Sequence, residues 1–142
     1  MKEIRTEVLI KASPKKVWSC FSDFKHYAEW NPFIRSIEGS VNAGNIVTIK
    51  LTPPDAKPMI FKPRVLTVDP NRELRWVGHF IVPGLFDGEH IFEFIDNNDG
   101  TTRFIQREIF NGILVPFLKK MLDDNTRRGF ELMNQKLKEK CE

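Results

Sequence analysis

The amino-acid sequence predicts an α+β fold in which a curved antiparallel sheet of about seven strands wraps around one long C-terminal helix. Two observations carry this prediction. One strand and two short helices are followed by a run of strand-like segments joined by short turns, and an amphipathic segment at residues 113–140 comes last. Consecutive strands joined by short loops pair in antiparallel fashion. A helix over residues 113–140 would be on the order of 40 Å long, enough to cross a small domain.

The N-terminal elements follow from alternation and from helix-capping residues. Residues 3–11 alternate aliphatic or β-branched side chains with charged ones, which is the period of a half-buried strand. Ser13 and Pro14 then predict a helix start, with serine as the N-cap and proline as the first helical residue. A second short helix is expected at residues 24–29. It ends before Pro32, because the residue that precedes a proline is disfavoured in the helical conformation.

The sheet continues through six further segments with strand character. They are expected at residues 34–40, 45–51, 59–69, 73–82, 87–96 and 101–110. Turn-forming sequences at residues 42–44, 69–71 and 97–100 separate them, each rich in Asn, Asp, Gly or Pro. Pro63 falls inside the segment 59–69 and predicts a bulge or an unpaired position there, since proline has no backbone N–H to donate.

The terminal segment is amphipathic when successive residues are placed 100° apart. The apolar arc contains Leu114, Phe117, Leu118, Met121, Leu122 and Met133, and the opposite face carries Lys120, Asp123, Arg127, Asn134 and Lys138. Asn125 and Gly129 lie near the middle of the apolar arc, where a packed helix normally carries Leu or Ala. An amide and a missing side chain at these positions predict a space between the helix and the sheet.

Composition limits the classes of function. A chain of 142 residues is expected to form one domain over residues 1–142. The net charge of +3 is small and basic residues are interleaved with acidic ones, so a nucleic-acid partner is not expected. No apolar run approaches the ~20 residues that span a membrane, and the N-terminus lacks a signal-peptide core, so a cytoplasmic location is expected.

Metal and cofactor motifs are not recognisable. Cys20 and Cys141 are too few and too far apart for a disulfide framework, and they are expected to be reduced packing residues. His26, His79 and His90 show no metal-ligand spacing with cysteine or carboxylate residues. The chain also has no phosphate-binding loop, nucleophile elbow or dinucleotide fingerprint, so no cofactor is expected.

Several local motifs, together with the order of elements, carry a family resemblance. They are Ala12–Trp18, Tyr27–Phe33, Leu74–Trp76, Phe86–Phe94, Gly100–Phe104 and Glu108–Gly112. These segments resemble the START-like, or SRPBCC, superfamily with its helix-grip fold, in particular the small bacterial branch of polyketide cyclase/dehydrase-like and lipid-transport-like proteins. The resemblance covers the whole chain and implies a deep, mostly apolar pocket. It names no ligand, because the superfamily includes carriers, cyclases, hydroxylase partner domains and chaperone activators.

Strand alternation selects the side chains that face such a pocket. Those expected on the inner face of the strands are Trp76, Gly78, Phe80, Phe86, Gly88, His90, Phe92, Phe94, Phe104, Gln106 and Glu108. On the last strand this face is chosen because the other carries Arg103 and Arg107. With residues of the helices added, the candidate ligand-binding set is Trp30, Trp76, His90, Phe92, Phe94, Phe104, Gln106, Glu108, Leu118, Leu122, Asn125 and Gly129. The two tryptophans either stack on a flat ligand or fill the core.

Three hypotheses of function follow. The leading one is binding of a hydrophobic or aromatic small molecule, lipid-like or polyketide-like, with His90, Gln106, Glu108 and Asn125 fixing its orientation. The first alternative is an enzyme of the cyclase/dehydratase type, in which His90 or Glu108 moves a proton. Against catalysis stands a structural alternative, in which these two side chains form an internal network. The second alternative is a protein-interaction or chaperone-activator-like module that uses Ile81–Phe86 or the terminal helix.

Overall fold

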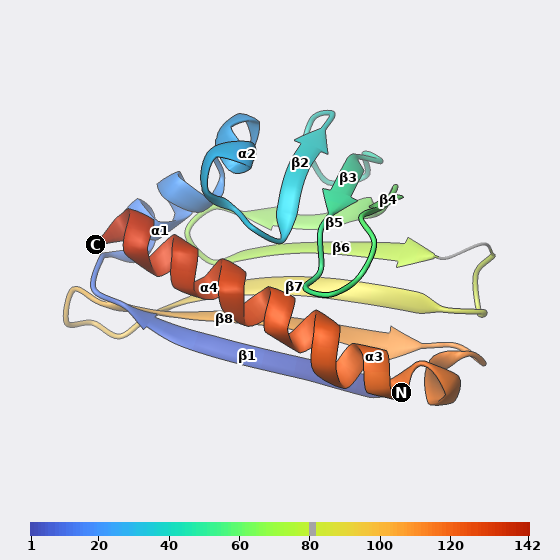
Figure 1. Cartoon of the computed structure of the whole chain (residues 1–142). Helices are drawn as coiled ribbons and strands as arrows, with labels where there is room; N and C mark the ends of the chain where they lie inside the picture. The colour runs from blue at the N-terminus through green and yellow to red at the C-terminus, as the bar shows by residue number, and fades with distance from the viewer. Residues whose placement is uncertain (80–81) are drawn as a thin grey trace.

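The α+β fold class is confirmed in the computed structural model, which describes residues 1–79 and 82–142. A five-stranded antiparallel sheet in the order β1-β8-β7-β6-β5 and a three-stranded sheet in the order β2-β3-β4 enclose a long C-terminal helix (Figure 1). The strands are β1 (Lys2–Ile10), β2 (Ile34–Glu38), β3 (Thr48–Leu51), β4 (Met59–Phe61), β5 (Arg64–Asp69), β6 (Glu73–His79), β7 (Asp87–Asp96) and β8 (Thr102–Asn111). The helical segments are α1 (Pro14–Phe21), η1 (Phe24–His26), α2 (Tyr27–Trp30), η2 (Val115–Phe117), α3 (Lys119–Met121), η3 (Leu122–Thr126) and α4 (Arg127–Cys141).

Helices follow β1 as expected, but the one predicted at residues 24–29 is a 3-10 turn, η1, followed directly by α2, which ends at Trp30. The Ser13 hydroxyl caps α1 by accepting a hydrogen bond from the Lys16 N–H at 3.3 Å. The chain then turns at Asn31, whose buried side-chain oxygen accepts from the N–H groups of Phe33 and Ile34 at 2.9 Å each. This bracing of the turn directs the chain from α2 into β2.

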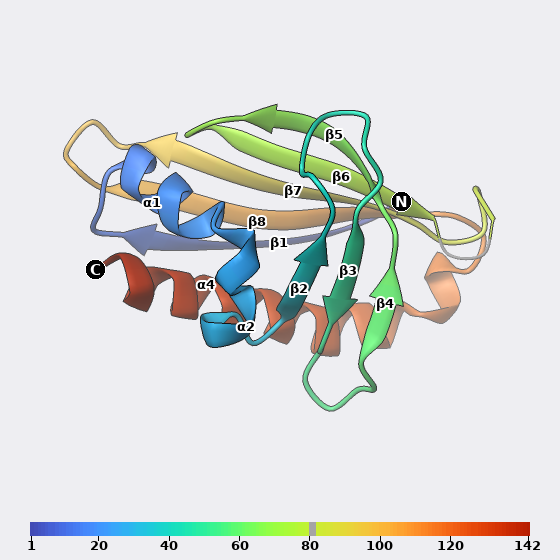
Figure 2. The same cartoon turned by 90° about the horizontal axis from the view of Figure 1, so that it is seen from above.

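The described residues contain eight strands in two sheets, where about seven strands in one curved sheet were predicted. The segment 59–69 is not one strand, because the chain changes sheet at Pro63: β4 pairs with β3, and β5 pairs with β6. The sheets stay joined at this corner, where Val47 N–H donates to the Pro63 carbonyl at 3.1 Å and Val65 N–H donates to the Asn45 carbonyl at 2.8 Å. The strands of the small sheet run crosswise to those of the large one (Figure 2).

Other boundaries shift by a few residues. The strand expected at 34–40 ends at Glu38, because Gly39 takes a positive φ of 103° that strand geometry does not allow. The strand expected from residue 45 begins at Thr48. The strand expected at 73–82 is described as far as His79, and its residues 80 and 81 lie outside the described part of the chain.

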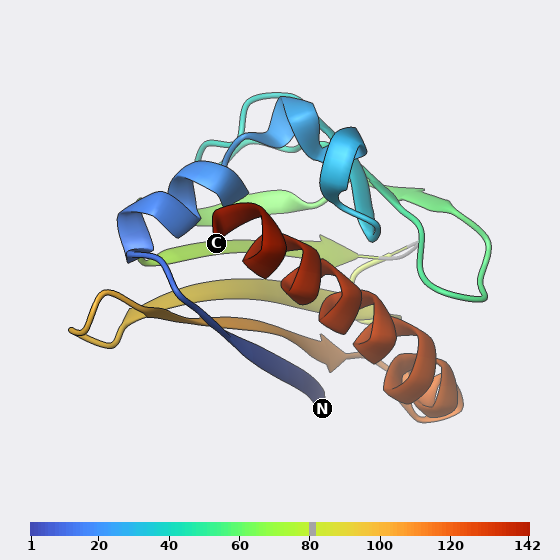
Figure 3. The ribbon, with the colours of Figure 1, turned by 60° about the vertical axis from the view of Figure 1, so that its left-hand side comes forward.

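The C-terminal helix begins later than predicted. Gly112 has a φ of 126°, and residues 115–117 then form a 3-10 turn that contains Pro116, so the continuous helical run starts at Lys119 and lies across the concave face of the large sheet (Figure 3). Phe117 was predicted on the apolar arc and is instead 82% exposed. Leu122 and Met133 are buried as predicted.

The helix also contains a π-helical stretch, η3. A π turn holds one residue more than an α turn, so the helix faces after it are rotated by about one residue. The buried positions of α4 are accordingly Gly129, Phe130, Met133, Asn134, Leu137 and Cys141. Asn134 was predicted on the solvent face and is buried, because that prediction assumed a constant 100° per residue throughout.

The end of the fold near the C-terminus is filled by aromatic side chains. Phe21 of α1 lies at the centre, with ring centroids 4.8 Å from Phe92, 5.1 Å from Phe94 and 5.9 Å from Phe104. Trp18 packs edge-on against Phe94 at 5.2 Å. Full burial of a side chain of this size stabilises the folded state by about 1.5–3 kcal/mol, so this cluster anchors α1 to the sheet.

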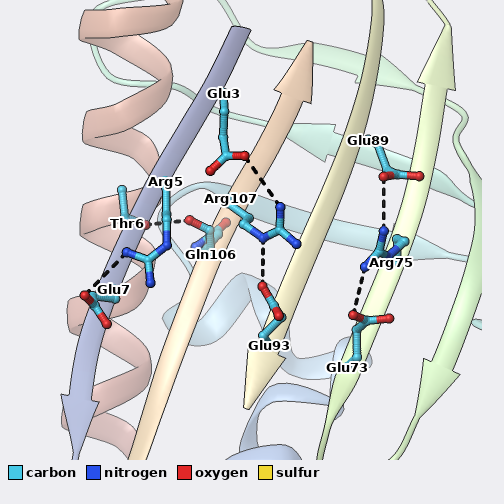
Figure 4. Close-up of polar contacts among 10 residues, drawn as sticks. All are labelled: Glu3, Arg5, Thr6, Glu7, Glu73, Arg75, Glu89, Glu93, Gln106 and Arg107. Atoms are coloured by element: carbon cyan, nitrogen blue, oxygen red, sulfur yellow. Dashed lines mark hydrogen bonds and ion pairs between the residues drawn. The ribbon is translucent and has the colours of Figure 1, made fainter. Parts of the chain in front are cut away.

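The face of the large sheet that points away from the C-terminal helix carries alternating acidic and basic side chains (Figure 4). Arg107 Nε lies 2.7 Å from a Glu93 carboxylate oxygen, and Arg75 lies between Glu73 at 2.9 Å and Glu89 at 3.2 Å. The prediction that the face of Arg107 points to solvent is therefore confirmed. Among the described helices, none combines the length and the apolar character that crossing a membrane requires, and the cytoplasmic location stays a prediction.

Candidate functional site

A cavity of about 300 Å³ lies between the large sheet, the small sheet and the start of the C-terminal helix. The large sheet contributes Gly78, Gly88, His90, Glu108 and Phe110. The C-terminal helical run contributes Met121, Leu122, Asn125 and Thr126, and the segment that leads into it contributes Leu114 and Leu118. The remaining wall consists of Phe33, Leu51, Pro53, Ala56, Met59, Phe61, Leu85 and Phe86. Most of these side chains are apolar, so the cavity is suited to an apolar guest.

Glycine at position 88 makes room for the carboxyl group of Glu108. Gly88 pairs with Phe110 across β7 and β8, next to the pair of His90 and Glu108. A Cβ atom at Gly88 would overlap the Glu108 carboxylate oxygen Oε2 and lie 3.3 Å from its Cδ. The absence of a side chain at residue 88 is therefore a requirement for the observed position of Glu108.

His90 and Glu108 form the polar centre of the cavity. His90 Nδ1 lies 3.5 Å from Glu108 Oε1, and the two side chains are 4% and 15% exposed. Three aromatic rings surround the imidazole: Phe92 stacks on it at 4.3 Å, with Phe130 at 4.9 Å and Trp76 at 5.5 Å. Within the described residues, His90 and Glu108 are the only titratable side chains that line the cavity.

Burial determines the charge state of this pair. Desolvation lowers the pKa of His90 to about 3, although a hydrogen bond with Gln106 acts in the opposite direction. Desolvation raises the pKa of Glu108 to about 8. The two groups are close enough for an ion pair, but the apolar surroundings disfavour both charges. At neutral pH the pair is therefore a neutral imidazole beside a largely protonated carboxyl group, which can donate a hydrogen bond into the cavity.

The family assignment rests on the whole sequence. The sequence profile of the family described as polyketide cyclase / dehydrase and lipid transport matches residues 1–142. The chain belongs to this family. No curated protein sequence matches it.

Known structures share the fold of this family member at low sequence identity. The aromatase/cyclase ZhuI of a Streptomyces species superposes with a TM-score of 0.79 at 14% identity, over 99% of this chain and 93% of that chain. A protein of Thermus thermophilus superposes at 0.76 with 18% identity, over 99% and 97%. Norcoclaurine synthase of Thalictrum flavum, in complex with dopamine and hydroxybenzaldehyde, superposes at 0.73 with 15% identity, over 97% and 84%. At these identities the likeness establishes the helix-grip fold.

Part of the predicted site set lies together in the cavity of this family member. Its walls include His90, Glu108, Leu118, Leu122 and Asn125. The choice of the inner face of β8 agrees with the burial of Phe104 and Gln106, and it puts Glu108 into the cavity.

Other members of that set lie elsewhere, which corrects their expected placement on the cavity wall. Trp76, Phe92, Phe94 and Phe104 are buried core residues that do not line the cavity. Trp76 lies across from His90, and the three phenylalanines lie further along β7 and β8 than the pair of His90 and Glu108. Gln106 lies behind His90. Gly129 faces Phe33, whose ring would overlap a Cβ atom there, so its space is filled by an aromatic side chain. Trp30 borders a surface depression with Asp23, His26, Glu29 and Lys140.

The loop that was considered for partner binding is only partly described. Phe80 and Ile81 lie outside the described residues. Val82 is 52% exposed, whereas Phe86 is buried, lines the cavity and stacks on Phe110 with a centroid distance of 5.5 Å. The loop thus contributes to the wall of the cavity through Phe86.

Sequence reasoning missed two parts of the site. The wall residues Phe33, Leu51, Met59 and Phe61 belong to or adjoin the small sheet, and a one-sheet prediction gave them no role. The second part is a buried polar chain behind His90 that includes Thr6 and Asn134. A signal for Thr6 was available, because it alternates inward with Ile4 and Val8 on β1.

Proposed function

We propose that this protein binds a neutral, largely apolar small molecule with aromatic rings and at least one carbonyl or hydroxyl oxygen. The observation that carries the proposal is an apolar cavity in which the titratable groups, His90 and Glu108, are buried, so that desolvation disfavours the charged form of both. The family description, which joins polyketide cyclase/dehydrase with lipid transport, supports a hydrophobic guest.

Affinity would come from burial of ring surface against the walls, at about 25 cal/mol per Å² removed from water. A volume of about 300 Å³ is at the lower end for small-molecule sites. A few fused rings fill such a space, whereas two long acyl chains do not. Orientation would come from the protonated Glu108, which donates to a carbonyl oxygen, and from the Asn125 amide. A carboxylate ligand would lose its hydration without gaining a cationic partner, so anionic guests are disfavoured.

Titration with two matched probes tests this proposal. Acetonaphthone and naphthoate have similar ring surfaces, but only naphthoate is charged at pH 7. We expect acetonaphthone to bind the protein at least about tenfold more tightly, which corresponds to about 1.4 kcal/mol. The substitution Leu122→Trp fills the cavity and should abolish binding, whereas Leu132→Trp, on the same helix at a position 47% exposed, should not. Equal binding by the two tryptophan variants would contradict the proposal.

Native mass spectrometry of the freshly purified protein gives an independent test. If a bound molecule is released on denaturation, its mass would indicate the chemical class of the ligand. A two-chain phospholipid as the stoichiometric passenger would refute the size argument.

A second candidate function is acid–base catalysis on such a ligand. It is favoured by the raised pKa of Glu108, about 8, which keeps a proton available at neutral pH. Glu108 would protonate a carbonyl oxygen during ring closure or dehydration, and its carboxylate would then take a proton from the adjacent carbon. The likeness to an aromatase/cyclase and to norcoclaurine synthase supports this class of chemistry. Glu108→Gln separates the two functions: lost turnover with retained binding indicates catalysis, and turnover unchanged by the substitution excludes Glu108 as the acid.

A further inference from the structure

A chain of buried hydrogen bonds runs from β1 through the C-terminal helix to His90. The Thr6 hydroxyl donates to the backbone carbonyl of Gln106 at 2.9 Å (Figure 4) and accepts from the Asn134 amide nitrogen at 2.8 Å. The Gln106 amide nitrogen lies 2.7 Å from the Asn134 side-chain oxygen and 3.4 Å from the Phe130 carbonyl. The Gln106 side-chain oxygen lies 3.0 Å from His90 Nε2. The four side chains that make these hydrogen bonds, Thr6, Asn134, Gln106 and His90, are all buried.

The donors and acceptors in this chain can be ordered in only one way. Because the single hydrogen of Thr6 goes to a carbonyl oxygen, Thr6 must accept from the nitrogen of Asn134. The oxygen of Asn134 then faces Gln106, which must offer its nitrogen. The Phe130 carbonyl, which can only accept, requires the same orientation of Gln106. The Gln106 oxygen is thereby left for His90, so His90 Nε2 has to carry a hydrogen.

We propose that Thr6, Asn134 and Gln106 are positioning residues that fix His90 as the Nε2–H tautomer, so that Nδ1 presents a lone pair to Glu108. A lone pair cannot donate to a carboxylate, so this tautomer withholds a hydrogen bond from the ionised form of Glu108. His90 therefore favours the protonated form of Glu108, whose single hydrogen stays available to a guest in the cavity. This inference rests on the proposed function for its purpose, but the tautomer itself is a property of the unliganded protein.

Among the described residues around His90, the charged side chains are paired elsewhere and do not set its tautomer. Asp123 and Arg127 at the start of the helix are engaged elsewhere, Asp123 with Lys2 at 2.5 Å and Arg127 with the Arg5 carbonyl at 3.1 Å. On the neighbouring strands, Glu89 pairs with Arg75, and Arg107 pairs with Glu93, on the outer face of the sheet. The His90 imidazole is otherwise covered by the rings of Trp76, Phe92 and Phe130.

Nitrogen-15 NMR of the histidine ring tests the proposal directly. In the unliganded protein at pH 7, His90 should show a protonated Nε2 and an unprotonated Nδ1. In Gln106→Leu, Nε2 loses its acceptor, so the proton should move to Nδ1 and donate to Glu108. The pKa of Glu108 should then fall by at least about one unit, since its ionised form gains a hydrogen bond.

Thr102→Val is a matched control, because the Thr102 hydroxyl is also buried and donates to a backbone carbonyl, that of Ala12, at 2.8 Å. This variant should keep the wild-type signature of His90. Thr6→Val provides a second test if Gln106→Leu does not fold. This variant should give a mixture of His90 tautomers, and Thr6→Ser should restore the single Nε2–H tautomer. A protonated Nδ1 or an imidazolium in the wild type, or an unchanged tautomer in both Gln106→Leu and Thr6→Val, would overturn the proposal. Failure of the neutral probe to bind, with the tautomer as expected, would refute the proposed function alone.

Discussion

The raised pKa of Glu108 predicts how the stability of this protein depends on pH. Its ordinary value is 4.5 and its value in the folded protein is about 8. Between these two pH values the unfolded chain has lost the proton and the folded protein has kept it. Each pH unit therefore costs the folded state about 1.4 kcal/mol relative to a residue that does not titrate. At pH 7 the cost is about 3 kcal/mol, and above pH 8 it levels off near about 5 kcal/mol.

Glu108→Gln removes this cost while keeping a side chain of similar size that can donate a hydrogen bond. Urea unfolding at pH 4 to 9 should give similar free energies of unfolding for the two proteins below pH 4.5. The variant should become progressively more stable as the pH rises, by about 3 kcal/mol at pH 7. Glu131→Gln, at an exposed position of α4, should leave the shape of the profile unchanged. Parallel profiles for wild type and Glu108→Gln would refute the argument that burial holds the proton on Glu108.

Three further predictions test the packing. Gly88→Ala should displace the Glu108 carboxyl group and lower the free energy of unfolding by about 1–3 kcal/mol, together with loss of probe binding; unchanged binding would contradict the overlap described above. In denaturant titrations, Phe21→Ala should destabilise the protein by about 3–5 kcal/mol, whereas Phe117→Ala should change its stability by less than about 0.5 kcal/mol. Burial raises the pKa of the Cys141 thiol to about 12, so this thiol should react with a thiol reagent only after unfolding; rapid reaction of the folded protein would show that the end of α4 is open.

The order of elements made the fold class predictable from the sequence. Alternation identified β1, β7 and β8 nearly to the residue, because those strands have one buried and one solvated face. The break at Pro63 was visible as an irregularity, but its result was not. Whether a chain bulges or moves to a second sheet depends on which partner strand is nearer, and residue period does not contain that information.

The site was only half predictable. Alternation put Phe92 and His90 on the same face, but it cannot tell which end of that face is filled, since α1 closes one end through Phe21. The burial of Asn134 was missed because η3 rotates the helix by about one residue. No residue type in Leu122–Thr126 predicts a π turn. The π turn lies where the helix passes the cavity.

The separation of the aromatic end from the cavity has a consequence for how such a protein can change during evolution. Phe21 and Phe104 belong to the core and do not line the cavity, whereas Met59 on β4 lines the cavity and does not belong to the core. Substitutions at wall positions such as Met59 can therefore accumulate without using up the stability margin of the domain. A single ancestral scaffold can in this way give rise to descendants with unrelated guests, each of which inherits the same aromatic core.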